Sequence, residues 1–258
     1  MRKLLFYNLT SCLLLSFCTV ISFPQKVKSG SKQQITNTKP KANPLDSKLI
    51  AAVKAENVEK VKKLLAQGAN PNATDYDIGF RIPVLNVILN QTENPNTERE
   101  IALALINAGA DVNGHGSTFY PPLLIAKDTE IVKLLIKKGA DVNYSSPRSA
   151  LWTPLHQAIF NSTNIPLLIA AGAKLNEVND EGNTPLMLAI SRIPTTEETE
   201  IDSETEKEIS KFTKCVQLLL EAGADTKIKN YEGKTALAMA KELNLPKVIE
   251  LLQKANQK

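Results

Sequence analysis

Apolar residues recur along most of this chain at the three- and four-residue spacing of amphipathic helices. Two such segments open its regular part, LDSKLIAAVKAE from Leu45 and VEKVKKLLAQG from Val58. A third segment, DTEIVKLLIKKG from Asp128, is expected to form the second helix of its pair. The pattern therefore predicts helices, arranged in pairs.

Many of these helical segments end in one recurring phrase: two leucine-like residues, two or three others, Gly-Ala, an acid or amide, and Asn. The copies are LLAQGANPN from Leu64, LINAGADVN from Leu105, LIKKGADVN from Leu135, LIAAGAKLN from Leu168 and LLEAGADTK from Leu219. Their glycines lie 41, 30, 33 and 51 residues apart, a period near 33 with two insertions. Self-similarity at such a period indicates a solenoid of stacked units.

A second phrase follows each copy of the first by about half a period. It reads TPLHQA from Thr153, TPLMLA from Thr184 and TALAMA from Thr235, with weaker copies PPLLIA from Pro121 and IPVLNV from Ile82. A threonine hydroxyl can cap a helix whose first position holds proline. A glycine such as Gly172 can end the next helix in the left-handed conformation. Each unit is therefore expected to contain two helices, a loop and a turn.

The two linked phrases together resemble the ankyrin repeat, and the resemblance covers roughly residues 45–258. It implies an all-α solenoid of about six helix-turn-helix repeats. The expected repeats are residues 45–72, 73–113, 114–143, 144–176, 177–227 and 228–258. The first repeat is rich in lysine, and the last ends in the polar tail QKANQK. Both are therefore expected to be capping repeats with one solvent-exposed face.

The largest insertion falls in the fifth repeat, IPTTEETEIDSETEKEISKF from Ile193, with seven acids between Glu197 and Glu208. One interpretation is a solvated loop leading into a long helix that buries Ile209, Phe212, Val216 and Leu219. The other is an acidic docking element, residues 193–210, for a basic partner.

Residues 1–22 are predicted to be a signal peptide, with Arg2 and Lys3 before an apolar centre. Residues 23–44 are polar and are predicted to be a flexible linker. The chain is then expected to be exported, periplasmic or secreted, without membrane insertion after cleavage. An alternative is a lipid anchor on Cys18, although Phe17 is bulky for the position before a lipidated cysteine.

Charge and cysteine content exclude several kinds of partner and chemistry. Without Arg2 and Lys3, 29 basic residues face 27 acidic ones, which gives no reason to expect nucleic acid. Removal of the signal leaves Cys215 as the single cysteine, so an internal disulfide is impossible. We expect a monomer whose stability comes from repeat stacking.

No catalytic, cofactor or metal site is expected, since the sequence offers no convergent set of reactive groups. His156 is the fourth letter of TPLH, which in ankyrin repeats typically makes structural hydrogen bonds. His115 lies between two glycines in a turn, and Cys215 is expected to be buried. An enzyme remains a third hypothesis only because repeats can hide unfamiliar sites.

The resemblance implies that turn tips and first helices line a binding groove. Aromatic residues and arginine are frequent binding hot spots. The candidate contact residues are Tyr76, Phe80, Arg81, Phe119, Tyr120, Tyr144, Arg148, Trp152 and Tyr231. For Phe80 and Trp152 the alternative is a structural plug against the next repeat.

The first functional hypothesis is an exported protein that captures an unidentified protein partner as a scaffold, protector or inhibitor. The second is a structural or stress-related envelope component, tethered by a lipid on Cys18.

Overall fold

The computed structural model describes residues 43–77, 80–91, 94–118, 120–146, 152–195 and 202–257. The predicted signal peptide and most of the predicted linker lie outside the described residues, as do Phe119 and Arg148.

The described helices form six successive pairs. The first three pairs are α1 (Pro44–Lys54) with α2 (Val58–Ala66), α3 (Val84–Gln91) with α4 (Pro95–Asn107), and α5 (Pro122–Ile125) with α6 (Thr129–Lys137). The fourth pair is α7 (Pro154–Gln157) and the 3-10 turn η1 (Ala158–Phe160), followed by η2 (Ser162–Asn164) and α8 (Ile165–Ala170). The last two are α9 (Pro185–Ser191) with α10 (Ser203–Glu221), and α11 (Ala236–Glu242) with α12 (Pro246–Ala255).

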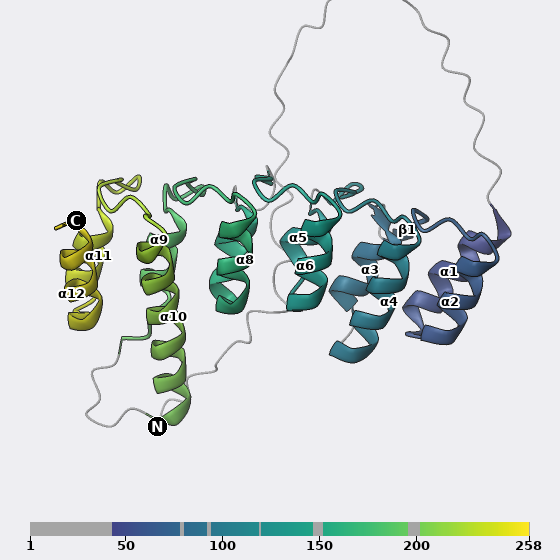
Figure 1. Cartoon of the computed structure of the whole chain (residues 1–258), viewed down its shortest axis with the longest axis horizontal. Coiled ribbons are helices and arrows are strands. Elements are labelled where there is room, and N and C mark those ends of the chain that lie inside the picture. Colours follow the sequence, from purple (N-terminus) through teal and green to yellow (C-terminus); the bar gives the residue numbers. More distant parts are fainter. Residues whose placement is uncertain are drawn as a thin grey trace, which may run out of the picture. The chain divides into compact units, whose positions relative to one another are not determined.

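The pairs stand side by side in chain order, with the turns between pairs along one edge (Figure 1). Each first helix contacts the first helix of the next pair, and the second helices make a parallel series of contacts. The buried leucine, isoleucine, valine and alanine side chains form one continuous cluster through all six pairs. No pair could bury its apolar face alone, so stacking supplies the core.

Threonine and proline start several first helices as the second phrase predicts. The Thr153 hydroxyl accepts a hydrogen bond from the His156 N–H at 3.4 Å, and Pro154 takes the first helical position. Thr184 and Thr235 cap α9 and α11 in the same way. These caps satisfy N–H groups that have no partner within the helix.

The asparagine that closes the first phrase links neighbouring repeats. The Asn143 side-chain amide donates to the Gly172 carbonyl at 3.1 Å and accepts from the Lys174 N–H at 2.8 Å. Gly172, at φ +88°, ends α8 in the left-handed conformation that the sequence indicated. Asn72 and Asn113 make the same two bonds to the repeats that follow them. The first recurring phrase therefore supplies both the glycine that ends a helix and the asparagine that hydrogen-bonds to the next repeat.

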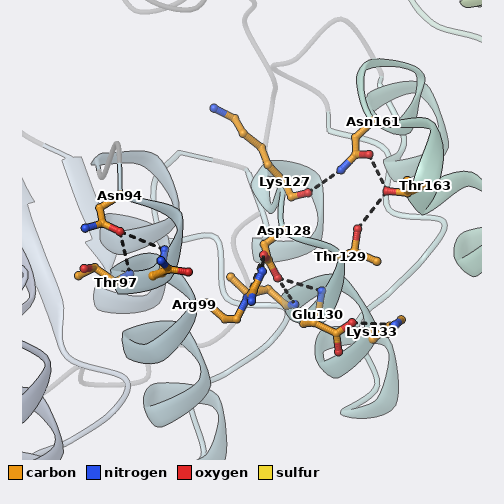
Figure 2. Close-up of polar contacts among 12 residues, drawn as sticks. Asn94, Thr97, Arg99, Lys127, Asp128, Thr129, Glu130, Lys133, Asn161 and Thr163 are labelled. Carbon is orange, nitrogen blue, oxygen red and sulfur yellow. Dashed lines mark hydrogen bonds and ion pairs between the residues drawn. The ribbon is translucent and has the colours of Figure 1, made fainter. Parts of the chain in front are cut away.

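A second set of links joins the opposite ends of the helices, at the starts of the second helices (Figure 2). The Arg99 guanidinium donates to Asp128, which caps α6, with an Nε–Oδ2 distance of 3.0 Å. The Asn161 amide donates to the Lys127 carbonyl at 2.8 Å. Burial acts to raise the pKa of Asp128, but hydrogen bonds from Arg99 and from two backbone N–H groups outweigh it and lower that pKa. The second, third and fourth repeats are thus tied together at both ends.

The second turn contains a feature that the sequence patterns do not indicate. Strands β1 (Thr74–Asp77) and β2 (Phe80–Pro83) form an antiparallel hairpin in which Tyr76 pairs with Arg81. The Arg81 carbonyl accepts a hydrogen bond from the Ser117 N–H at 2.8 Å. The hairpin is therefore held by the turn of the third repeat.

Helix α10 contains the end of the large insertion and extends beyond its neighbours, away from the turns (Figure 1). Phe212, Val216 and Leu219 are buried as expected, and Ile209 is half-buried. The acidic residues of its first turns, Glu204, Glu206 and Glu208, are exposed. Within the described ranges, no helix has both the length and the apolar character needed to cross a membrane.

Candidate functional site

Most of the exposed large aromatic side chains of the described residues lie in the turns between the helix pairs. Among the residues that the structure describes, four large apolar side chains are exposed: Tyr76 (69 %), Phe80 (45 %), Phe160 (38 %) and Tyr231 (72 %). Three of them are predicted contact residues in turns. Phe160, at the end of η1, is not among the predicted contact residues.

The β1–β2 hairpin presents Tyr76, Phe80 and Arg81 together. The Arg81 guanidinium lies over the Tyr76 ring, 5.8 Å from its centroid. An ion pair between Lys54 and Asp75 joins β1 to the end of α1. Strand pairing positions the two strands, and the Arg81 guanidinium helps to hold the Tyr76 ring for contact.

The third and fourth turns hold their candidate residues less exposed. Tyr120 is half-buried, and its backbone carbonyl accepts a hydrogen bond from the Asn86 amide at 2.6 Å. Tyr144 is also half-buried, with its ring 5.9 Å from that of His115. Burial raises the pKa of both phenols. These rings can present an edge to a partner but contribute to repeat packing as well.

Trp152 lies against the core and is half-buried. Its ring stacks on Phe160 with centroids 5.8 Å apart and planes at 9°. Phe160 in turn meets Phe212 of α10 edge to face, and the Arg192 guanidinium lies 5.6 Å from the Phe160 ring centroid. Trp152 thus packs on Phe160 of its own repeat, and Phe160 makes the contact with the fifth repeat, an arrangement consistent with the plug alternative.

We predict that Trp152→Ala lowers the free energy of unfolding by about 2 kcal/mol, because it removes a half-buried aromatic stack. The matched variant Tyr231→Ala should change it by less than about 0.5 kcal/mol, since that ring is largely exposed. Urea unfolding of the two variants checks this. An unchanged unfolding midpoint for Trp152→Ala would contradict the structural role and support Trp152 as a contact residue.

A buried polar network supports the turns of the last three repeats. The Thr153 N–H donates to His156 Nδ1 at 3.2 Å, so the proton of the neutral ring is on Nε2, which donates to the Asn183 carbonyl at 3.1 Å. The Asn183 side chain accepts from the Asn230 amide at 3.1 Å. Burial lowers the pKa of His156, and the bond to Asn183 offsets this only in part. His156 therefore has a structural role in the network.

The titratable groups do not form a reactive centre in the described part of the chain. Cys215 is buried, and burial raises its pKa to about 11, which disfavours the thiolate that a nucleophile needs. No three His, Cys, Asp or Glu side chains of the described residues gather where a metal ion could bind.

Two family models of the ankyrin repeat match parts of this chain. The model for "Ankyrin repeats (3 copies)" matches residues 123–197, and that for a single "Ankyrin repeat" matches residues 49–76 and 181–231. The chain is 26 % identical over 212 residues to the putative ankyrin repeat protein YahD of Escherichia coli K12, covering 81 % of this chain and 95 % of YahD. It is 28 % identical over 190 residues to the chicken nuclear factor NF-kappa-B p105 subunit, which is 70 % of this chain but only 17 % of that protein.

Solved structures show the same architecture. The crystal structure of the ankyrin repeat protein EF0377 aligns with a TM-score of 0.66 at 25 % identity, covering 81 % of this chain and 97 % of EF0377. An ankyrin repeat domain from Acinetobacter baumannii AYE aligns with a TM-score of 0.65 at 27 % identity, with the same coverage. The expected helical solenoid is thereby confirmed.

Proposed function

Since this chain belongs to the ankyrin-repeat family, we propose that it is an exported binding protein that captures another protein through its turn tips and first helices. Ankyrin repeats are scaffolds for protein–protein interaction, with a constant stack and a variable contact surface. A stable complex would bury about 1,200–2,000 Å² in total.

The observation that carries the proposal is the position of the most exposed aromatic rings. Tyr76 and Phe80 lie in the second turn and Tyr231 in the last, so they bracket the turn side of the stack. Exposed aromatic rings on rigid turns suit binding, because they bring large contact area with little loss of conformational entropy. By contrast, the starts of the second helices are engaged in links between repeats (Figure 2).

A capture experiment with two matched variants tests the proposal. The triple variant Tyr76→Ala/Phe80→Ala/Tyr231→Ala should retain the partner at least about tenfold less well than the wild type, because hot spots dominate binding. The control Lys62→Ala/Lys133→Ala/Lys254→Ala removes exposed side chains of α2, α6 and α12 and should bind normally. Equal capture by both triple variants would contradict the proposed surface.

Export is the part of the proposal that rests on residues 1–22 alone. Mass spectrometry of the protein from its native cells should find a chain that begins near Phe23. An acylated N-terminal Cys18 would instead support the lipid-tethered alternative, and an intact Met1 would contradict export.

A further inference from the structure

A small pocket opens between α9 and α11, next to the last turn. Its volume is about 250 Å³. The lining side chains that define its character are Ser191, Glu232, Lys234, Met239, Glu242 and Leu243. Met239 and Leu243 supply apolar surface, and Glu232 and Glu242 supply carboxylates. The pocket lies between first helices, on the proposed binding side.

The two carboxylates already hold a cation. The Lys234 ammonium lies 3.0 Å from Glu232 Oε2 and 2.7 Å from Glu242 Oε2. The hydrogen bonds that the Lys234 ammonium donates to these carboxylates raise the pKa of Lys234, and the one to Glu242 has the larger effect. The pocket geometry is therefore suited to a positive group, and its three charged side chains sum to one negative charge.

The internal ion pairs are weak enough to be exchanged. The Glu232 and Glu242 side chains are 69 % and 59 % exposed, and that of Lys234 is 35 % exposed. Exposed ion pairs of this kind contribute little to stability because water screens them. Lys234 can therefore turn to solvent at small cost when another cation enters.

The size and lining of the pocket indicate the incoming group. A volume of about 250 Å³ is below the range of about 300–1,000 Å³ usual for small-molecule sites, so the pocket suits a single long side chain. Arginine can lay its methylene stem on Met239 and Leu243 while its head reaches the carboxylates. Its planar guanidinium binds carboxylates through paired hydrogen bonds, which an ammonium cannot do.

We propose that this pocket receives an arginine side chain of the protein partner, which displaces Lys234 from Glu232 and Glu242. The inference rests on the proposed function and adds the chemistry of the partner: a segment with an arginine beside residues that contact Tyr231. Tyr231 is exposed and belongs to the same turn as Glu232 and Lys234, so one segment can reach both.

Titration with N-acetyl-arginine methylamide, followed by amide NMR of the full chain, tests the pocket directly. We expect saturable shifts confined to the amides around Glu232, Lys234, Met239 and Glu242. The citrulline analogue has the same shape without the charge and should cause no such shifts. Absent shifts, shifts spread over all acidic surfaces, or equal shifts with citrulline would each overturn the proposal.

Two substitutions should change the affinity in opposite directions. Glu242→Gln should weaken binding of the blocked arginine about fivefold, whereas Lys234→Met, which removes the internal competitor, should strengthen it about threefold. Glu250→Gln and Lys254→Met make the same charge changes in an exposed ion pair of α12 and serve as controls. If the pocket and control variants change the affinity equally, the effect comes from the net charge of the protein and not from the pocket, and the proposal is overturned.

The two proposals fail separately, because the capture experiment with Tyr76, Phe80 and Tyr231 does not use this probe. If that triple variant loses capture but the blocked arginine causes no shifts, the proposed binding surface is supported and only the arginine pocket is contradicted.

Discussion

His156→Ala is expected to lower the free energy of unfolding by about 3 kcal/mol at pH 7, close to the upper end for single substitutions. The ring is fully buried and joins Thr153 to the Asn183 carbonyl of the next repeat. Its removal leaves a cavity and a buried carbonyl without its donor. Urea unfolding at pH 7 measures the loss.

The cost of His156→Ala should also depend on pH. The folded-state pKa of His156 is lowered from its ordinary value of 6.5, mainly by burial. Above pH 6.5 the ring is neutral in both states and its full contribution is present. Below pH 6.5 the unfolded chain binds a proton that the folded chain rejects, so the contribution falls by up to about 1.4 kcal/mol per pH unit until the folded-state pKa is reached.

The difference between wild type and His156→Ala should therefore shrink between pH 7 and pH 5.5. Comparison of the two proteins cancels the titration of other groups that both share. A cost that is the same at both pH values, or that grows on acidification, would contradict a neutral ring in the fold.

Gly116→Ala should cost about 3 kcal/mol or more and should loosen the hairpin. A Cβ atom at this position would lie 2.0 Å from the Arg81 carbonyl oxygen and 2.9 Å from Pro83 Cδ, so backbone must move. The same carbonyl accepts the hydrogen bond from Ser117 that attaches β2 to the third turn. Thermal unfolding gives the cost, and hydrogen exchange of Thr74–Pro83 reports the loosening.

Gly139→Ala is the matched control for Gly116→Ala. Gly139 also has a positive φ, +87°, but a Cβ atom there meets nothing within 4 Å. It should cost only the backbone strain of about 1–2 kcal/mol, without loosening the hairpin. If the two glycines cost the same, the close approach of turn and hairpin is not present in solution.

The parts of the fold that could be predicted are those with local signals. Thr153 and Pro154 start a helix through neighbours in sequence, and Gly172 ends one through its own backbone conformation. The buried stripe of α10 follows from spacing alone. The hairpin could not be predicted, because it depends on Gly116 and Ser117, more than thirty residues away from its strands.

The candidate binding surface, too, could be predicted from the sequence only in part. The exposure of Tyr76 and Tyr231 follows from their place in turns between helices. The stacking of Trp152 on Phe160 does not follow from sequence, because it needs the first helix of the fourth repeat to end in a 3-10 turn. The ion pairs of Lys234 with Glu232 and Glu242 join the last turn to the end of α11, and the sequence alone did not indicate them.

Hydrogen exchange of the chain, with and without the partner recovered by capture, shows whether the turns and first helices form the binding surface. We expect slower exchange in the hairpin, in the last turn around Tyr231 and in the first helices α9 and α11, with α2, α6 and α12 unchanged. Protection confined to the second helices, with the turns exchanging as before, would contradict it.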